Sequence, residues 1–400
     1  MRLALVLALV LCLAPAAAAA PPPEIAAPEA IALEATTGDV IFEKDADTRR
    51  PMASTTKLMT ALIVLEQADL KDVVTAPRYD GLSVETVMRL VPGEKITVHD
   101  LLRGLLLVSA NDAAFTLAKH VGGSVPSFVR MMNRRAQQLG LQNTSYANPI
   151  GLDDAANYST ARDLATLTVE LRKSRVFRRI VNATDLATRS GNPRTLANRN
   201  ALVTEYGWVN GVKTGTTLDA GYVLVASGNK NDVPIVSVVM GATDEAARDD
   251  QSVALLNYGF SKFKFKRLTV ENDRSKGMIP IRHRAGAELP VVYGATVRQV
   301  LRKKADTKVE VSLPAEVEGP VDYHEPVGEA VVSVDGETVA TVPLLAALEV
   351  PATGFGRRVQ NVLTQPWSLV ALGVVLLLAT LLTQRRRPAQ RRRTRGETAA

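Results

Sequence analysis

Apolar positions in the first half of the chain recur at the three- and four-residue spacing of amphipathic helices. The pattern covers residues 54–65, 97–120, 125–139 and 160–173. Within 97–120 it breaks near Ser109-Ala110-Asn111, and Thr160 stands where a helix cap is expected. The pattern therefore predicts a block of core helices with an interruption at residues 109–111.

Strand patterns flank this helical block. Residues 32–35 and 40–43 are short runs around Thr37-Gly38-Asp39, which predicts a β-hairpin. Beyond about residue 207, segments 208–214 and 221–226 are β-rich and joined by Gly215-Thr216-Thr217; 233–239 is a further strand, and 246–260 is helical again. We predict an α/β (α+β) domain over residues 25–262, with an antiparallel sheet faced by helices and a helical subdomain.

The pattern changes after this domain. Residues 264–350 lack helical periodicity, and 309–313 and 330–337 have the composition of short strands with a hairpin turn. We predict a separate, small all-β domain, which Thr353-Gly354-Phe355-Gly356 links to the C-terminal segment.

Both ends of the chain show membrane-targeting patterns. Residues 1–20 combine a charged start, an apolar run and small residues, which predicts a secretory signal peptide. Residues 366–383 are free of charge, close to the lower length limit of a transmembrane helix, and the arginine-rich tail 384–400 follows. Cationic segments stay in the cytoplasm. We predict a single-pass protein of the cell membrane with an extracytoplasmic catalytic domain and a cytoplasmic tail; the tail disfavours the alternative of a buried core helix.

The net charge of +7 describes this tail rather than the body of the protein. Residues 385–400 contribute +6 and Arg2 contributes +1, so the remainder is neutral. We therefore expect no binding of nucleic acid.

Cysteine and histidine limit the candidate chemistry. The single cysteine, Cys12, lies in the predicted signal peptide, so the mature chain has no disulfide, thiol nucleophile or Cys-ligated metal. The four histidines have no metal-site spacing, and no G-x-S-x-G elbow is present. We predict no metal or cofactor, and a hydrolase with these residues would need a lysine to activate its nucleophile.

Ser54 and Lys57 form the first candidate pair. They are three residues apart at the start of a predicted helix, so both side chains share one face. A lysine in a first helical turn opposes the helix dipole, which is consistent with a neutral base. An ordinary helix cap with an exposed lysine is the alternative, and S-x-x-K also occurs at Ser227 and Ser261. The motif is weak by itself.

Two further motifs follow in order. Ser109-Ala110-Asn111 lies 55 residues after Ser54, and Lys213-Thr214-Gly215 lies 104 residues after Ser109. S-x-N recurs at Ser190 and Ser227, whereas K-T-G occurs once. The ordered set corresponds to the S-x-x-K, S-D-N and K-T-G signature of penicillin-binding proteins and class A β-lactamases, with Ala110 at the middle position of the second motif.

On these residues the chain resembles the serine-type D-alanyl-D-alanine carboxypeptidases of the low-molecular-mass penicillin-binding protein group, peptidase family S11. The resemblance covers about residues 25–260 and, more loosely, the β-rich domain. It implies the fold shared by DD-peptidases and serine β-lactamases, a five-stranded antiparallel sheet flanked by helices, with the active site between sheet and helical subdomain. The segments that resemble the family are 53–60, 107–113, 148–152, 158–161, 198–200 and 211–216.

The resemblance and the residue types imply an acyl-enzyme mechanism. Ser54 is the expected nucleophile, and Lys57, kept uncharged by burial and a nearby cation, is its expected base. We expect Ser109 to pass a proton to the leaving amine, and Asn111 to hold Lys57 or the substrate amide. Backbone N–H groups of Ser54 and Thr216 would form the oxyanion hole.

The remaining candidates would bind the substrate. Lys213 would supply positive charge for the terminal carboxylate of the peptide, Thr214 and Thr216 would offer hydroxyls, and Gly215 belongs to the same segment. Arg199 and Arg248 are candidates for organising the cleft, with a surface salt bridge as the alternative for each. The expected partners are the peptidoglycan stem peptide, β-lactam antibiotics as inhibitors, and the membrane.

Three other functions compete with this prediction. A class A β-lactamase needs a glutamate on a loop between the second and third motifs, and residues 147–153 offer no E-x-x-L-N pattern. DD-endopeptidase activity on crosslinks stays open. A catalytically silent wall-binding scaffold is disfavoured because every motif residue is present.

Overall fold

The computed structural model describes residues 21–354, 356, 359–360 and 365–385. The predicted signal peptide and nearly all of the predicted cytoplasmic tail lie outside these residues. The chain divides into two compact units. The first comprises Met1–Phe265 with Val300–Lys303, and the second comprises Lys266–Gln299 with Lys304–Ala400.

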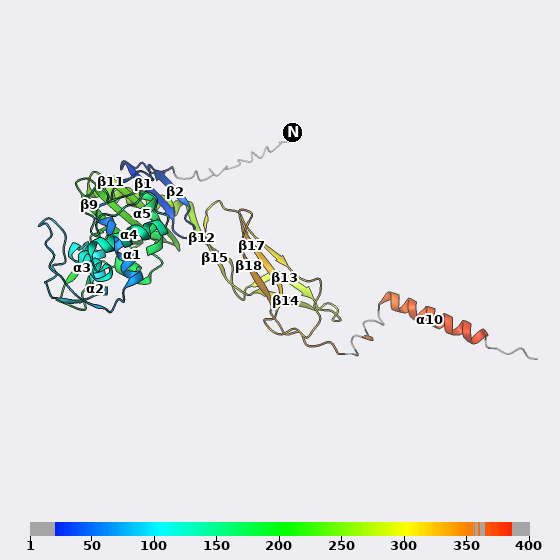
Figure 1. The fold of residues 1–400 in the computed structure, drawn as a ribbon. Coiled ribbons are helices and arrows are strands. Elements are labelled where there is room, and N and C mark those ends of the chain that lie inside the picture. The colour runs from blue at the N-terminus through cyan, green and yellow to red at the C-terminus, as the bar shows by residue number, and fades with distance from the viewer. Residues whose placement is uncertain (1–20, 355, 357–358, 361–364, 386–400) are drawn as a thin grey trace, which may run out of the picture. The chain divides into compact units, whose positions relative to one another are not determined.

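A five-stranded antiparallel sheet is the centre of the first unit (Figure 1), as the resemblance implied. Its strand order is β2-β1-β11-β10-β9, and Val225 of β10 pairs with both Val238 of β11 and Lys213 of β9. The predicted N-terminal hairpin is confirmed as β1 and β2. The strands are β1 (Glu29–Glu34), β2 (Val40–Lys44), β9 (Val209–Thr217), β10 (Gly221–Lys230) and β11 (Val233–Ala242).

Helices cover both faces of this sheet. Successive residues of a strand point to opposite faces, so neighbours in the sequence pack in different cores. On β1, Ile31 packs in the large core formed by α1 and α5, whereas Ala32 packs on the other face with Leu255 of α8. On β10, Val225 and Leu224 divide in the same way. The sheet is therefore a middle layer between helices, and Figure 1 shows α1, α4 and α5 beside it.

The periodic segments form helices close to their predicted bounds. The predicted interruption is confirmed: a π-helical turn, Gly104–Val108, is followed by Ser109 in the left-handed conformation before α3 begins. Thr160 caps α5 by accepting the Asp163 N–H. The helices are α1 (Lys57–Gln67), α2 (Val98–Arg103), α3 (Asn111–Gly122), α4 (Val125–Gln138), α5 (Ala161–Leu171), α6 (Arg175–Val181), α7 (Leu202–Glu205) and α8 (Glu245–Lys262).

Two predicted bounds are wrong. The helix predicted to open at Ser54 begins at Lys57, and Ser54 lies in a 3-10 turn, Ala53–Thr56, before it. Gly215-Thr216-Thr217 is no connecting loop but the end of β9, and the turn follows it. Helices α6 and α7 and three small ladders were not predicted: β3 (Arg50–Pro51) with β6 (Tyr158–Ser159), β4 (Val73–Thr75) with β5 (Lys95–Thr97), and β7 (Asp185–Ala187) with β8 (Thr195–Ala197).

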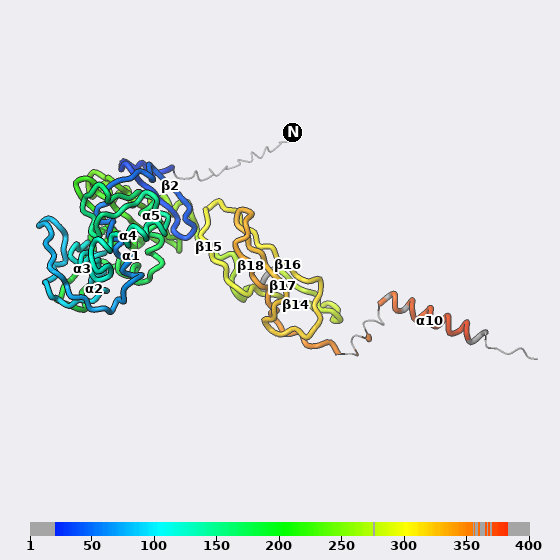
Figure 2. Tube along the Cα trace, viewed as in Figure 1, coloured from blue at the N-terminus to red at the C-terminus, as the bar shows by residue number. Residues whose placement is uncertain are grey.

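The second unit contains a five-stranded antiparallel sheet of order β13-β14-β18-β17-β16, and Figure 2 traces its backbone. Its core includes Ile279, Val332 and Leu344. The predicted all-β domain is confirmed, with its hairpin turn at Asp335-Gly336 between β17 and β18. The strands of this sheet are β13 (Arg274–Pro280), β14 (Glu288–Tyr293), β16 (Thr307–Ser312), β17 (Pro326–Val334) and β18 (Glu337–Ala346). Strands β12 (Phe263–Thr269) and β15 (Val297–Arg302) form a separate two-stranded ladder, and each has residues in both units.

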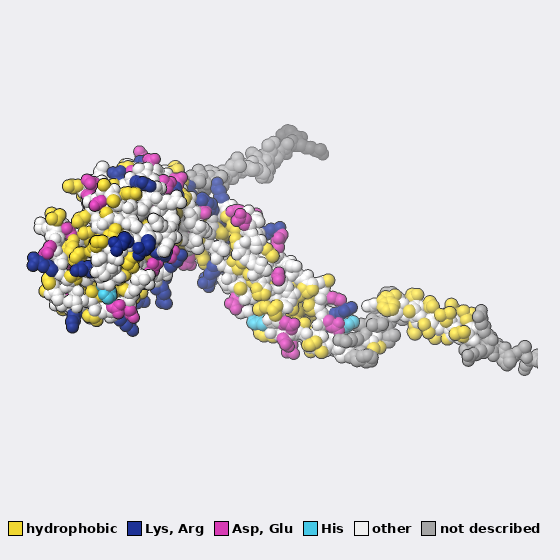
Figure 3. All heavy atoms as spheres, viewed as in Figure 1, with side chains coloured by type: hydrophobic (Ala, Val, Ile, Leu, Met, Phe, Trp, Pro, Cys, Tyr) yellow, Lys and Arg dark blue, Asp and Glu magenta, His cyan; other side chains and the backbone are white. Residues whose placement is uncertain are grey.

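A helix, α10 (Pro366–Arg385), occupies the segment that the sequence predicts to span the membrane. Hydrophobic side chains cover its visible surface (Figure 3). Among the described residues, no helix combines the length and the apolar character needed to cross a membrane.

Candidate active site

The turn that contains Ser54 is shaped before α1 begins. Ala53 has a φ of +49°, an uncommon value for a residue with a side chain, and Thr55 Oγ1 donates to the Met52 carbonyl at 2.6 Å. Thr55 and Thr56 are buried, whereas Ser54 is half-buried. The Ser54 hydroxyl caps neither the 3-10 turn nor α1. It instead accepts a hydrogen bond from Lys57.

Lys57 is fully buried at the first position of α1. Its Nζ donates to Ser54 Oγ at 2.9 Å and to the Ile150 carbonyl. Burial lowers the pKa of the amine to about 7, and the negative charge of Glu85 opposes this shift. Lys57 is thus no solvated surface lysine, and near neutral pH a large fraction of it is the free amine that can accept a proton.

The Ile150 carbonyl is positioned by a tight loop. Asn148 Oδ1 accepts the N–H groups of Ile150, Gly151 and Leu152 at 3.2, 2.6 and 3.2 Å. Gly151 has a φ of +89°, and a Cβ there would lie 2.1 Å from the Ala53 carbonyl oxygen. Glycine is therefore required for this loop to press against the Ser54 turn. The contact of Ile150 with Lys57 was not predicted from the sequence.

Ser109 lies at the junction between the π-helical turn and α3. Its φ and ψ are 64° and 35°, and its hydroxyl is buried without a hydrogen-bond partner in the described part of the chain. Ser109 also lines the cleft that contains Ser54. An unpaired buried hydroxyl costs folding free energy and is available to a bound substrate.

Asn111 begins α3 and is buried. Its Nδ2 donates to Glu85 at 2.7 Å, and its backbone N–H donates to the Thr86 carbonyl at 2.8 Å. No hydrogen bond joins Asn111 to Lys57 among the described residues. The structure therefore connects the second motif to the segment around residues 85–86, a connection that the sequence did not indicate.

Glu85 is the main site residue that sequence reasoning missed. Its carboxylate accepts hydrogen bonds from the hydroxyl of Tyr79 and the backbone N–H of Leu82, in addition to Asn111. Burial favours its neutral form, but these bonds and the charge of Lys57 prevail and hold its pKa below the usual value. No motif or periodic pattern surrounds Glu85, so no signal in the sequence could have found it.

Strand β9 brings the third motif to the nucleophile. A Cβ on Gly215 would lie 3.0 Å from the Ser54 backbone nitrogen, so the strand passes directly beside the turn. Lys213 is buried, and its Nζ donates to the Thr214 carbonyl at 2.8 Å. Burial, followed by the charges of Lys57, Arg199 and Arg248, lowers the pKa of Lys213 well below its usual value.

Two arginines add positive charge to the cleft. Arg199 is exposed, and its Nη1 donates to Thr86 Oγ1 at 2.7 Å. Arg248 is 2% exposed and is paired with Glu245 and Asp249, each at 2.8 Å. Both arginines line the cleft with Ser54, so neither is remote from the candidate nucleophile.

One cleft of about 380 Å³ is lined by seven of the ten predicted site residues, whereas Lys57, Asn111 and Lys213 are not among its lining residues. Its chemistry is an oxygen nucleophile beside a partly neutral amine, an unpaired hydroxyl, and guanidinium groups that suit a carboxylate. The described residues contain no group of three or more His, Cys, Asp or Glu side chains that could hold a metal ion. The lining residues are Ser54, Val84, Thr86, Ser109, Arg199, Thr214, Gly215, Thr216, Tyr222, Glu245 and Arg248.

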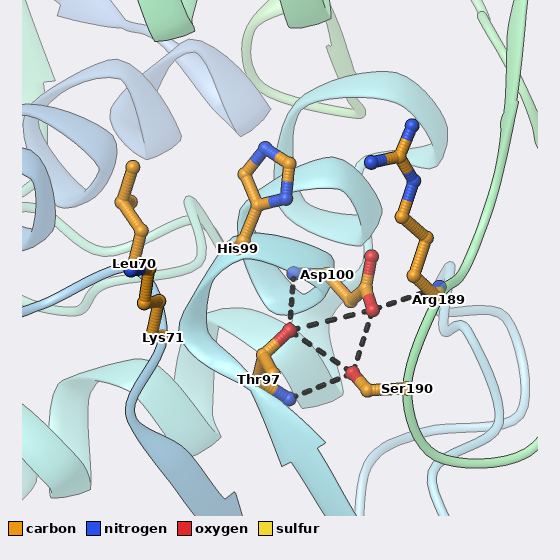
Figure 4. A pocket seen from close by; sticks show the side chains of 7 residues that line it. All are labelled: Leu70, Lys71, Thr97, His99, Asp100, Arg189 and Ser190. Atoms are coloured by element: carbon orange, nitrogen blue, oxygen red, sulfur yellow. Dashed lines mark hydrogen bonds between the residues drawn. The ribbon is translucent and has the colours of Figure 1, made fainter.

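A second hollow, of about 310 Å³, lies at the start of α2 (Figure 4). Here Asp100 accepts a hydrogen bond from Ser190 at 2.6 Å, and Ser190 Oγ accepts the Thr97 N–H at 2.9 Å. Arg103 pairs with the same carboxylate at 2.8 Å. Asp100 therefore connects α2 to the segment around Ser190, although the buried Arg103 Nε has no hydrogen-bond partner among the described residues. The hollow is lined by none of the motif residues, so we interpret these contacts as structural.

Two family models match the chain. The model described as "D-alanyl-D-alanine carboxypeptidase" matches residues 16–244, and the model described as "Penicillin-binding protein 5, C-terminal domain" matches residues 285–352. Together they cover the catalytic region and much of the all-β domain predicted from the sequence.

Individual proteins agree with the family models. The D-alanyl-D-alanine carboxypeptidase DacF of Bacillus subtilis is 31% identical over 340 residues, which cover 82% of this chain and 87% of the relative. The crystal structure of the carboxypeptidase DacD from Francisella tularensis superposes with a TM-score of 0.61 at 26% identity, over 85% of this chain and 98% of that one. The crystal structure of the Streptomyces K15 DD-transpeptidase superposes with a TM-score of 0.58 at 35% identity, over 60% of this chain and 100% of that one.

Proposed function

The chain belongs to the D-alanyl-D-alanine carboxypeptidase family S11, a family of serine hydrolases, and we propose that it acts through an acyl-enzyme on Ser54 and is acylated by penicillin. The observation that supports this most is the 2.9 Å hydrogen bond from the buried Lys57 amine to Ser54 Oγ. A nucleophile in contact with a base of suitable pKa is the arrangement that covalent catalysis requires.

In the acylation step, Ser54 Oγ attacks the carbonyl carbon of the penultimate D-alanine while its proton moves to Lys57. The N–H groups of Ser54 and Thr216 stabilise the oxyanion. The C–N bond then breaks, and the proton passes through Ser109 to the leaving amine of the terminal D-alanine. The peptide remains as an ester on Ser54, and Lys57 is neutral again.

In deacylation, a water molecule attacks the ester carbonyl, and Lys57 takes a proton from the water. The ester bond to Ser54 breaks, and the proton returns to Ser54 Oγ. The products are free D-alanine and a stem peptide shortened by one residue. In penicillin the strained lactam amide would take the place of the peptide bond.

The terminal carboxylate would bind among the cations of the cleft. Arg199 and Arg248 line it directly, and Thr214 and Thr216 offer hydroxyls. Lys213 is buried and donates to the Thr214 carbonyl, and burial and its cationic neighbours lower its pKa. A bound carboxylate would oppose both effects, so we propose that substrate binding favours the protonated form of Lys213.

We also propose that the protein is exported and anchored in the cell membrane, with the catalytic unit extracytoplasmic. The support is the uncharged segment 366–383 before the arginine tail, together with apolar side chains such as Leu372 and Leu377 that are exposed on α10. Truncation after residue 353 should move the mature protein from the membrane fraction to the soluble fraction. Retention in the membrane would contradict an anchor at this segment.

Labelling with a fluorescent penicillin tests the nucleophile. We expect the full-length protein to be labelled covalently and the Ser54→Ala variant to remain unlabelled. A labelled Ser54→Ala variant would show that another residue forms the acyl-enzyme.

Release of D-alanine tests the reaction. The purified protein, given a peptide ending in D-Ala-D-Ala without an added amine, should release free D-alanine. This separates carboxypeptidase activity from the transpeptidase activity named for the Streptomyces K15 relative. Acylation without release would exclude carboxypeptidase activity under these conditions.

A further inference from the structure

We propose that Glu85 is a positioning residue for acylation, because its carboxylate orients the Asn111 side chain and provides the negative charge that faces Lys57. This inference rests on the proposed role of Lys57 as the base. Glu85 lies outside the three sequence motifs, yet it contacts Asn111 of the second motif directly.

The orientation of Asn111 follows from hydrogen-bond chemistry. An ionised carboxylate only accepts hydrogen bonds, so the amide must present its NH₂ group to Glu85, at 2.7 Å. The amide oxygen, on the other side of the group, is then left to accept an N–H donor. With a neutral side chain at position 85, the Asn111 amide could turn over and present the wrong group to a substrate.

The segment around Glu85 is fixed in several ways. The Tyr79 hydroxyl and the Leu82 N–H both donate to the carboxylate. A Cβ on Gly81 would lie 2.4 Å from the Tyr79 ring, so glycine permits this close turn. Thr86, the next residue, accepts from Arg199 and is bonded through its carbonyl to the Asn111 N–H. The carboxylate is thus held by residues that precede Glu85 in the sequence and by the contacts of Thr86, which follows it.

The charge of Glu85 also acts on Lys57. Burial lowers the pKa of Lys57 to about 7, and Glu85 raises it against that effect. Lys213 is the cation that interacts electrostatically with Lys57, and the charges of Arg199 and Arg248 act in turn on Lys213. Glu85 is therefore the acidic group that acts on Lys57, whereas Arg248 is paired with Glu245 and Asp249. The charge of Glu85 keeps Lys57 basic enough to remove the Ser54 proton.

Glu85→Gln tests both effects, because it removes the charge with almost no change in shape. We measure the second-order rate constant of acylation by benzylpenicillin from pH 5.5 to 9. The parent rate should rise through a pH of about 7 as Lys57 loses its proton. In Glu85→Gln this rise should shift to lower pH by about 0.5 unit or more, and the plateau should fall about tenfold, the size of a charged hydrogen bond.

Two further variants separate the charge from the contact. Glu85→Asp keeps the charge but withdraws the carboxylate from Asn111, so its plateau should fall while its pH midpoint stays near that of the parent. Asp80→Asn removes a charge from the same segment, where Asp80 pairs only with the exposed Arg78 in the described structure. It should change neither quantity. Thermal unfolding verifies that each variant is folded, and Glu85→Asp tests the contact even where Glu85→Gln fails to fold.

Two results would overturn the inference: a Glu85→Gln profile that matches the parent, or a lower plateau with an unmoved midpoint, which would mean a purely structural role. Failure of the proposed function is recognised separately, by label that persists in Ser54→Ala. An unlabelled Ser54→Ala beside an unchanged Glu85→Gln would reject the role of Glu85 alone.

Discussion

The two units differ in the charged side chains that they bury. The first unit buries several cationic side chains, among them Lys57 at the start of α1, Lys213 in β9 and Arg248 in α8. In the second unit, the buried polar side chains of the described residues are threonines, Thr269 and Thr353, and its core is aliphatic. Burying a cation costs folding free energy unless it is paired. Among the described residues, the first unit therefore carries buried cations that oppose its folding, and the second unit carries none.

Among the tests of this contrast, Lys57→Met should have the largest effect, and this effect is on the acylation rate. The substitution removes the proposed base and retains a side chain of similar length and apolar stem. The acylation rate should fall by about 10³-fold, within the range for loss of general base catalysis. The measurement is the rate of labelling by penicillin at pH 8. A variant within tenfold of the parent would show that Lys57 is not the base.

The same variant should be more stable than the parent at neutral pH. In the unfolded chain Lys57 binds a proton below a pH of about 10.4, whereas in the folded protein it does so only below about 7. Its burial therefore costs folding free energy at pH 7 but little above pH 10.4. After allowance for the lost hydrogen bonds, we expect a net gain of about 2 kcal/mol at pH 7.

Denaturant unfolding at pH 7 and at pH 10 measures this gain. The advantage of Lys57→Met over the parent should shrink as the pH rises, because the parent no longer pays for an uncharged lysine. Equal differences at both pH values would contradict the assignment of the penalty to Lys57.

The local sequence was sufficient to predict that Ser54 and Lys57 lie together, but not to predict the residues that surround them. Ser54 and Lys57 are three residues apart, so one turn of chain brings them together. Glu85 contacts Asn111, which lies 26 residues further along the chain. Ile150 contacts Lys57, which lies 93 residues before it. Such contacts depend on how separate elements pack, which hydrophobic periodicity does not encode.

The segment around Glu85 illustrates the reason. Met88 and Leu90 donate their backbone N–H groups to Asp112, each at 2.9 Å, and Arg194 donates to the Met88 carbonyl at 2.7 Å. Side chains from distant elements therefore replace the regular backbone pairing that a helix or strand would supply. In contrast, strands β10 and β11 of the first unit and β16 and β17 of the second were predicted from their own apolar and β-branched residues, because the burial of a strand depends directly on its own side chains. The five-stranded order of the first sheet was implied by the family resemblance, and β13 and β14 were not predicted.

Leu344→Ala sharpens the comparison from the side of the second unit. Leu344 is fully buried in the aliphatic core of that unit. Its truncation should destabilise the second unit by about 2–5 kcal/mol, the usual cost of a core cavity. Every residue that lines the catalytic cleft belongs to the first unit, so the penicillin acylation rate at 20 °C should stay within twofold of the parent. Unfolding followed by calorimetry and labelling measured in parallel distinguish the two effects.

The smallest effect is expected for substitutions of exposed arginines. They compare the contribution of an exposed cation to KM in the first unit and in the second. Arg199→Ala removes an exposed guanidinium from the cleft, and we expect KM for a D-Ala-D-Ala peptide to rise about tenfold, since a hydrogen bond to a charged group contributes about 1.5–3 kcal/mol. Arg282→Ala is the matched control in the second unit, where Arg282 is half-exposed and pairs with Glu316 at 3.2 Å. Exposed ion pairs contribute about 0–1 kcal/mol to stability, so this control should change neither KM nor kcat.

Thr86→Val completes this test, because Arg199 also donates to Thr86. The variant retains the guanidinium but removes its support, so KM should rise less than in Arg199→Ala. A KM as high as that of Arg199→Ala would assign the effect to the order of the segment around Glu85 rather than to charge. Equal KM values for Arg199→Ala and Arg282→Ala would instead remove Arg199 from carboxylate recognition, and leave the buried Lys213 and Arg248 as its cations.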